Sequence, residues 1–123
     1  GSPEPGSGGG FTFSRDNSWN YNLVTPVDTS ADVDVFFIDM GKWGAAAVVI
    51  DELHDKGKGV VCYISIGTVE DWRDDAKEFP SSAIGGDVSG WAGEKWVDVN
   101  DKDVREIMTA RVEMASSMNC DAV

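Results

Sequence analysis

Two apolar runs rich in β-branched and aromatic residues constrain the fold of this chain more than any other feature. Residues 33–39 read Val-Asp-Val-Phe-Phe-Ile-Asp, and residues 60–66 read Val-Val-Cys-Tyr-Ile-Ser-Ile. Continuous apolar centres of this kind are typical of strands that are covered on both faces. The two runs therefore predict neighbouring strands of a parallel sheet.

An amphipathic helix is predicted between these two strands, over residues 45–56, and Gly57 supplies a C-terminal stop. The positions expected to face the sheet are Ala45, Val48, Val49 and Leu53. Strand, helix and strand lie within about 35 residues, which is the size of a βαβ unit with a right-handed crossover.

The remaining elements continue the same alternation. Residues 19–23 alternate polar and apolar side chains and predict a short first strand. A second helix is expected to begin after Asp101 as N-cap and to end at Asn119, and residues 120–123 resemble the start of another strand. Alternating strands and helices indicate a parallel α/β fold, and a TIM-type (β/α) barrel needs roughly 250 residues. We therefore expect about the first half of such a barrel, strands 1 to 4.

The connection over residues 68–99 interrupts this rhythm. It contains acidic residues, three tryptophans, Pro80 and the pair Gly85-Gly86. We expect an unusually long loop, and loops of this length are usually functional.

Composition excludes several classes of partner. The formal net charge of -12 and the absence of a basic patch argue against nucleic acid, because phosphate contacts need clustered Lys and Arg. No apolar run approaches the ~20 residues of a membrane span. The opening residues 1–10 are almost entirely Gly, Ser and Pro. We assign residues 1–18 to a linker or tail and residues 19–123 to the partial barrel domain.

The two cysteines, Cys62 and Cys120, are too few for a disulfide scaffold and lack metal-ligand spacing. Because one βα unit separates them, we expect them on neighbouring parallel strands. A bridge and two buried thiols both remain open. No metal and no cofactor is expected.

Several motifs in order resemble glycoside hydrolase family 114, the endo-α-1,4-polygalactosaminidase-like barrels. The longest is the segment at 61–74, Val-Cys-Tyr-Ile-Ser-Ile-Gly-Thr-Val-Glu-Asp-Trp-Arg-Asp. The others lie at residues 19–23, 38–39, 79–80, 90–94, 96–98, 107–111 and 120–123. The resemblance thus covers nearly everything after the linker.

The resemblance implies a secreted barrel that acts on α-linked, galactosamine-rich polysaccharide through carboxylates at the strand ends. In the family, the segment resembling residues 120–123 continues into an acidic strand end, and a further acid comes from a later strand. Both positions would lie beyond Val123. The remaining half of the barrel is therefore expected from the same polypeptide or from another chain.

Two carboxylates in the sequence are candidates for glycosidic chemistry, which needs a pair about 5 to 10 Å apart. Asp39 follows a buried strand, so it should lie at the C-terminal rim where barrel enzymes place their sites. Glu70 follows the next strand. The alternative for Asp39 is an N-cap or a salt bridge with Lys42 or Arg73, and Glu70 is alternatively a solvated loop charge.

Three further residues are candidates for substrate binding. Tyr63 alternates with Cys62 and is expected to point into the barrel, although a hydrogen-bonded core tyrosine is the alternative. Arg73 is flanked by acidic residues and is either a ligand contact or a loop-ordering ion pair. Trp91, flanked by glycines, is the tryptophan expected to stack on a sugar ring. His54 is expected to be only a surface residue.

The sequence therefore favours a secreted, carbohydrate-active barrel that binds a polysaccharide substrate or glycan ligand. The alternative is a non-catalytic module for glycan binding or for structure in an extracellular assembly. Whether this chain is itself an enzyme stays open, because the complete catalytic site is not expected within it.

Overall fold

The computed structural model describes residues 10–41 and 43–123 and divides the chain into two compact units. One unit holds the chain up to Ile64 together with Glu113–Val123, and the other holds Ser65–Val112. Each unit is described by itself. We call them the parallel-sheet unit and the antiparallel-sheet unit, after the sheet that each contains.

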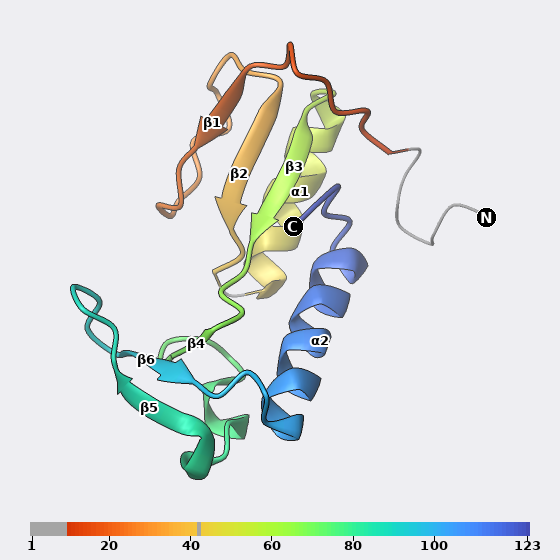
Figure 1. Cartoon of the computed structure of the whole chain (residues 1–123). Helices are drawn as coiled ribbons and strands as arrows, with labels where there is room; N and C mark the ends of the chain where they lie inside the picture. Colours follow the sequence, from red (N-terminus) through yellow and green to blue (C-terminus); the bar gives the residue numbers. More distant parts are fainter. Residues whose placement is uncertain (1–9, 42) are drawn as a thin grey trace. The chain divides into compact units, whose positions relative to one another are not determined.

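The parallel-sheet unit contains strands β1 (Trp19–Tyr21), β2 (Val35–Asp39) and β3 (Gly59–Tyr63), which pair in that order (Figure 1). Both pairings are parallel. A parallel bridge between Val61 and Ala122 adds the start of a fourth strand beside β3. The predicted parallel βαβ unit is confirmed.

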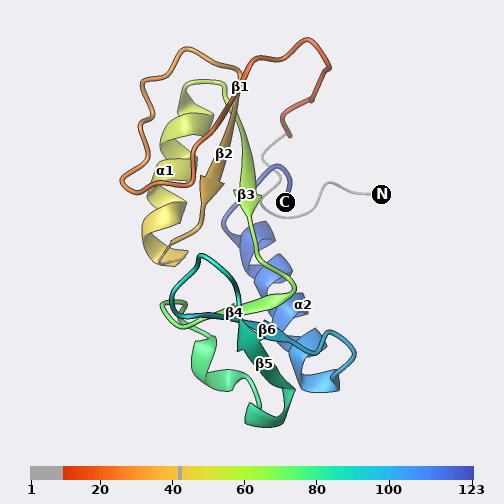
Figure 2. The same ribbon diagram turned by 60° about the vertical axis from the view of Figure 1, so that its left-hand side comes forward.

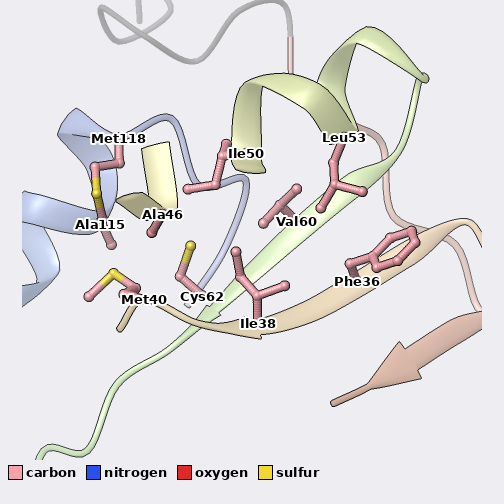
Figure 3. Packing of buried hydrophobic residues seen from close by; sticks show 10 residues of the cluster. All are labelled: Phe36, Ile38, Met40, Ala46, Ile50, Leu53, Val60, Cys62, Ala115 and Met118. Atoms are coloured by element: carbon pink, nitrogen blue, oxygen red, sulfur yellow. The ribbon is translucent and has the colours of Figure 1, made fainter. Parts of the chain in front are cut away.

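Helix α1 (Trp43–Asp55) connects β2 to β3 and packs against one face of the sheet (Figure 3). The buried core of this unit consists of Phe36, Ile38, Met40, Ala46, Ile50, Leu53, Val60, Cys62, Ala115 and Met118. Leu53 was predicted in this role. Gly57 ends the helical segment with φ of +76°, a backbone conformation that glycine adopts at little cost.

The predicted buried face of α1 is wrong for two of its four positions. Ala45 and Val48 are exposed, Val48 at 68%, whereas Ala46 and Ile50 are buried. The helix carries apolar residues at every position from 45 to 50, so two overlapping faces both satisfy the 3.6-residue period. Periodicity alone could not choose between them.

Residues 68–99 are not the irregular loop that the sequence predicts. They form an antiparallel sheet of β4 (Thr68–Glu70), β6 (Glu94–Val97) and β5 (Ile84–Asp87), in that order (Figure 2). Two single-turn 3-10 helices, Ala76–Glu78 and Ser81–Ala83, lie between β4 and β5. Strands this short, rich in glycine and charge, carry almost no alternation of apolar and polar residues.

Helix α2 (Lys102–Ser117) follows β6, and the boundary between the two units falls within it. Asp101 is its N-cap, because its Oδ1 accepts the N–H groups of Asp103 and Val104 at 2.9 and 3.1 Å. Asn119, with φ of +69°, follows the helix end. Both predicted ends are confirmed. In the antiparallel-sheet unit the buried core is Val69, Phe79, Ala83 and Val104.

Cys62 and Cys120 form a disulfide bond, with their Cα atoms 6.0 Å apart. The sequence placed the two cysteines on neighbouring strands but left the bridge open. Cys62 lies in β3, and Cys120 lies two residues before Ala122, which pairs with β3. The alternative of two reduced thiols is wrong for this structure.

His54 is not merely a surface residue, as the sequence predicts. Its Nε2 lies 2.7 Å from Oδ2 of Asp121, whose side chain is only 7% exposed. The same carboxylate oxygen accepts the N–H of Val60 at 2.9 Å. His54 thus joins α1 to the chain segment that pairs with β3.

Part of the predicted 1–18 linker makes defined contacts, whereas residues 1–9 of it lie outside the described residues. The ring of Phe11 fills the space beside Gly59, where a Cβ would lie 2.5 Å from it. Ser18 donates its N–H to Asp34 Oδ2 at 2.9 Å. No helix in the described ranges has the length and apolar character needed to cross a lipid bilayer.

Candidate functional site

Asp39 and Tyr63 lie side by side at the C-terminal ends of β2 and β3. They are direct register partners in the parallel pairing, and both are half-buried. Each follows a buried residue of the core that α1 covers, Ile38 and Cys62 respectively. Because side chains alternate along a strand, Asp39 and Tyr63 project from the face opposite α1. This edge of a parallel α/β sheet is where ligands usually bind.

Asp39 also has a local structural role. Its Oδ1 accepts the N–H of Gly41 at 2.8 Å, which closes a tight turn directly before α1. Gly41 has φ of +55°, a conformation that favours glycine. Lys42, which the sequence offered as a salt-bridge partner of Asp39, lies outside the described residues.

The same face of the sheet carries an apolar hollow of about 380 Å³. It is lined by side chains from all three strands, including Trp19, Tyr21, Phe37 and Val61, and by Phe13. Trp19 and Tyr21 both contact the ring of Phe37, with centroids 6.2 and 5.5 Å apart. The face that carries Asp39 and Tyr63 is therefore otherwise aromatic and apolar.

In the antiparallel-sheet unit, Glu70 is a buried and ion-paired carboxylate. It is 3% exposed, and its Oε2 accepts a hydrogen bond from Arg73 Nη2 at 2.8 Å. Its other oxygen, Oε1, lies 3.8 Å from Arg111 Nη1 and accepts no hydrogen bond within the described part of the chain. Glu70 is thus not the solvated loop charge that the sequence offered as its alternative role.

Arg111 holds a second buried carboxylate in this unit. Its Nε and Nη2 donate to Asp75 Oδ2 and Oδ1 at 2.7 and 2.8 Å, and its Nη1 donates to the carbonyl of Ser65 at 2.8 Å. Arg111 and Asp75 are 2% and 4% exposed. Bidentate contacts between a guanidinium and a carboxylate fix the relative orientation of the two groups and also pair their charges.

Glu94 is a residue of this unit that sequence reasoning missed. It lies in β6 directly opposite Glu70 in β4, so the two carboxylates leave the sheet on the same face. Thr68 donates its hydroxyl to Glu94 Oε2 at 2.8 Å and is itself hydrogen-bonded to Ser65. Only the pairing of β4 with β6 reveals this arrangement, and that pairing has no clear sequence signal.

Three exposed tryptophans belong to the antiparallel-sheet unit. Trp91 is 63% exposed in the turn between β5 and β6, and Trp96 is 55% exposed on β6. Trp72 is 47% exposed, with the guanidinium of Arg73 5.8 Å from its ring centroid. Arg73 therefore contacts both an acid and an aromatic ring. Within residues 10–41 and 43–123, no group of three or more His, Cys, Asp or Glu is placed to hold a metal ion.

Comparison with known protein families identifies the family of this chain. The model of glycoside-hydrolase family GH114 matches residues 2–123. The chain belongs to family GH114. This family match agrees with the resemblance carried by the motifs at residues 61–74 and 90–98.

Two solved structures are similar to this GH114 chain. The crystal structure of Aspergillus fumigatus Ega3 in complex with galactosamine is 34% identical in sequence, with a TM-score of 0.77 over 85% of this chain. The glycoside hydrolase domain of PelA from Pseudomonas aeruginosa is 14% identical, with a TM-score of 0.61 over 84% of this chain, and supports the fold alone. No curated protein matches the chain.

The GH114 chain spans 41% of the Ega3 chain and 40% of the PelA chain. Three of its carboxylates lie in two local settings. Asp39 is half-buried at a strand end beside Tyr63, and Glu70 and Glu94 face each other across two antiparallel strands. Cleavage of a glycosidic bond generally uses a pair of carboxyl groups, one as acid and the other as base or nucleophile.

Proposed function

We propose that this GH114 chain contributes the first strands of a (β/α) barrel that hydrolyses α-1,4-linked, galactosamine-rich polysaccharide outside the cell. The observation that carries the proposal is the 34% identity to Ega3, whose crystal structure is a complex with galactosamine. The family match over residues 2–123 supports the same class of reaction, hydrolysis of a glycosidic bond.

The parallel-sheet unit supports the barrel part of this proposal. Strands β1, β2 and β3 pair in chain order, α1 crosses between two of them, and Ala122 begins a fourth position beside β3. Consecutive parallel strands joined by helices are the repeating unit of a TIM barrel. The remaining strands would come from the same polypeptide or from another chain.

We propose Asp39 and Glu70 as the carboxylates of this chain that act at the polysaccharide. Asp39 is supported by its place at a strand end, next to Tyr63. Glu70 is supported by Arg73, which fixes the position of its carboxylate. Tyr63, Arg73 and Trp91 are proposed as contacts to the sugar, with Trp91 supported by its 63% exposure.

The disulfide between Cys62 and Cys120 supports a secreted location. Disulfides form and persist in oxidising compartments and are rare in the cytosol. The bond joins β3 to the chain segment that pairs with it, which is typical of a structural disulfide.

One observation supports a second candidate function. In this alternative, the chain is a non-catalytic module that binds glycans or has a structural role in an extracellular assembly. Glu70 is ion-paired with Arg73 and faces Arg111, which is the setting of many carboxylates with a purely structural role. Exposed Trp72, Trp91 and Trp96 would still bind sugars in such a module.

The test is hydrolysis by the full-length protein. It is incubated with α-1,4-linked galactosamine polymer, and new reducing ends are counted against a neutral polygalactose control. We expect release from the cationic polymer, and a loss of about 100-fold or more in Asp39→Asn, as for removal of a general acid or base. Binding without release, in wild type and variant alike, would instead favour the non-catalytic function.

A further inference from the structure

Glu94 and Trp96 are neighbours on one face of β6. They are two positions apart in the strand, so their side chains project from the same side of the sheet. Trp96 is 55% exposed, and Glu94 is half-buried. An accessible aromatic surface therefore lies directly beside a carboxylate.

The Glu94 carboxylate is held in place through one oxygen. Its Oε2 accepts the hydroxyl of Thr68 at 2.8 Å, and Thr68 is fixed in turn by Ser65. Thr68 also lies opposite Trp96 in the pairing of β4 with β6. Among the described residues, no hydrogen bond to the second oxygen, Oε1, is found. A carboxylate oriented in this way loses little side-chain entropy on binding.

Glu94 differs in its contacts from the two buried carboxylates of this unit. Glu70 is ion-paired with Arg73 and Arg111, and Asp75 is ion-paired with Arg111. Glu94, directly opposite Glu70, forms no ion pair with any residue that the structure describes. Like charges directly opposite each other across a sheet are unfavourable.

The buried neighbour Glu70 is not the carboxylate that a ligand can reach. Its side chain is only 3% exposed, and its Oε1 lies 3.8 Å from Arg111 Nη1. Glu94 is half-buried, so it is the accessible carboxylate of this cross-strand pair.

We propose that Glu94 and Trp96 form a binding subsite for a protonated amino sugar. The ammonium group donates to Oε1 of Glu94, and the apolar face of the sugar ring stacks on Trp96. The subsite gives the proposed hydrolase its selectivity for galactosamine over neutral or N-acetylated units, and in that sense it rests on the proposed function.

An ammonium group fits the observations better than a metal ion. Among the described residues, no three His, Cys, Asp or Glu side chains gather closely enough to ligate a metal. An ammonium donates three hydrogen bonds and needs only one or two carboxylates. The adjacent ring of Trp96 supplies the apolar contact that a sugar needs and a metal does not.

The test measures sugar binding by the full-length protein. Galactosamine, N-acetylgalactosamine and galactose are titrated separately by NMR, with the indole N–H signal of Trp96 assigned from its absence in Trp96→Ala. We expect galactosamine to shift this signal and to bind at least about tenfold tighter than the other two sugars, as a charge-assisted hydrogen bond provides. Glu94→Gln should abolish this preference while galactose affinity stays unchanged.

The Gln side chain still accepts the hydroxyl of Thr68, so Glu94→Gln removes the charge and keeps the local hydrogen bond. Glu106→Gln, an exposed glutamate on α2, is the matched control and should retain the preference. If Glu94→Gln binds galactosamine as tightly as wild type does, the subsite proposal is wrong, even if the protein hydrolyses the polymer. If the preference for galactosamine depends on Glu94 but the protein does not hydrolyse the polymer, the subsite proposal stands and the proposed function is wrong.

Discussion

The guanidinium of Arg111 donates two hydrogen bonds, of 2.7 and 2.8 Å, to the carboxylate of Asp75 inside the antiparallel-sheet unit. Asp75 lies just before a single-turn 3-10 helix, and Arg111 lies in α2, 36 residues later. The pair therefore ties a loop with little secondary structure of its own to a helix. Its stability contribution can be measured directly.

Arg111→Ala should lower the free energy of unfolding by about 3–5 kcal/mol, because it leaves Asp75 buried without its cation. Arg111→Lys keeps the charge but not the two-point geometry, and it should recover only part of this loss. Urea unfolding followed by circular dichroism measures both values. Arg105→Ala, at an exposed position of the same helix, is the control and should change stability by less than about 0.5 kcal/mol.

Gly93 and Gly90 offer a matched pair, because both have φ of +83°. Alanine at either position should cost about 1–2 kcal/mol in unfolding free energy through the backbone alone. At Gly93 a Cβ would also lie 2.6 Å from both carboxylate oxygens of Asp71, whereas nothing lies within 4 Å at Gly90. We expect Gly93→Ala to be the more destabilising by about 0.5–1.5 kcal/mol, the cost of moving Asp71 off its rotamer.

The excess cost at Gly93 should vanish when the Asp71 side chain is first truncated by the substitution Asp71→Ala. If Gly93→Ala lowers the unfolding free energy equally in the wild-type protein and in the Asp71→Ala variant, the contact between the new Cβ and Asp71 does not affect stability. Thermal unfolding of wild type, the two single variants and the double variant completes the double-mutant cycle.

Asp39→Asn should separate the structural role of Asp39 from its proposed chemical role. Asn keeps an oxygen that can accept the N–H of Gly41, so the unfolding free energy should fall by less than about 1 kcal/mol. Asp39→Ala removes this acceptor and should cost more, about 1 kcal/mol. If polymer hydrolysis by Asp39→Asn equals that of wild type, the carboxylate of Asp39 is not required for the reaction.

Removing the disulfide should destabilise the protein strongly. The bridge closes a segment with a sequence separation of 58, for which chain entropy predicts about 4 kcal/mol. We expect Cys62→Ser with Cys120→Ser to lower the unfolding free energy by this amount relative to wild type. Adding reductant to wild type should produce the same loss, and an unchanged urea midpoint under reductant would contradict the expectation.

The exposed carboxyl of Asp34 should titrate below its usual range. The N–H of Ser18 donates to it at 2.9 Å, and this backbone hydrogen bond is the main reason that the pKa of Asp34 is lowered. A lowered folded pKa stabilises the fold above the unfolded value of about 3.9, and this contribution is lost as the pH falls through the folded pKa. Carboxyl-carbon NMR measures the titration.

Ser18→Ala removes the hydroxyl, whose oxygen accepts the backbone N–H of Asp34 and which is a lesser cause of the lowered pKa of Asp34. The substitution leaves the backbone N–H of Ser18 in place as a donor to the carboxylate. Most of the shift should therefore persist in this variant. A return of the Asp34 pKa to its ordinary value in Ser18→Ala would assign the effect to the hydroxyl instead.

The parallel-sheet unit was predictable because its strands are continuous apolar runs. Residues 33–39 and 60–66 carry enough β-branched and aromatic side chains to identify buried strands, and the intervening helix fixes their parallel pairing. The placement of Asp39 and Tyr63 at one edge follows from that pairing alone. The exact face of α1 did not follow, because Ala46 and Val48 are both apolar in sequence.

The antiparallel-sheet unit was not predictable in this way. Its strands hold three or four residues each, and Gly85 and Gly86 occupy the middle of β5. Such segments gain their strand conformation from pairing and from packing, which are tertiary effects. Glu94 was missed for this reason, since only its pairing opposite Glu70 distinguishes it from other charged residues.

The disulfide has a topological consequence for proteolysis. Cys62 and Cys120 lie on either side of Ser65–Val112, so the entire antiparallel-sheet unit is contained within one covalent ring. A protease that cuts the exposed turn at Gly90 would open the ring without releasing either fragment. A nicked molecule would run as one band on a non-reducing gel and as two after reduction. In a protease-rich environment, the two halves of a cut chain would stay together.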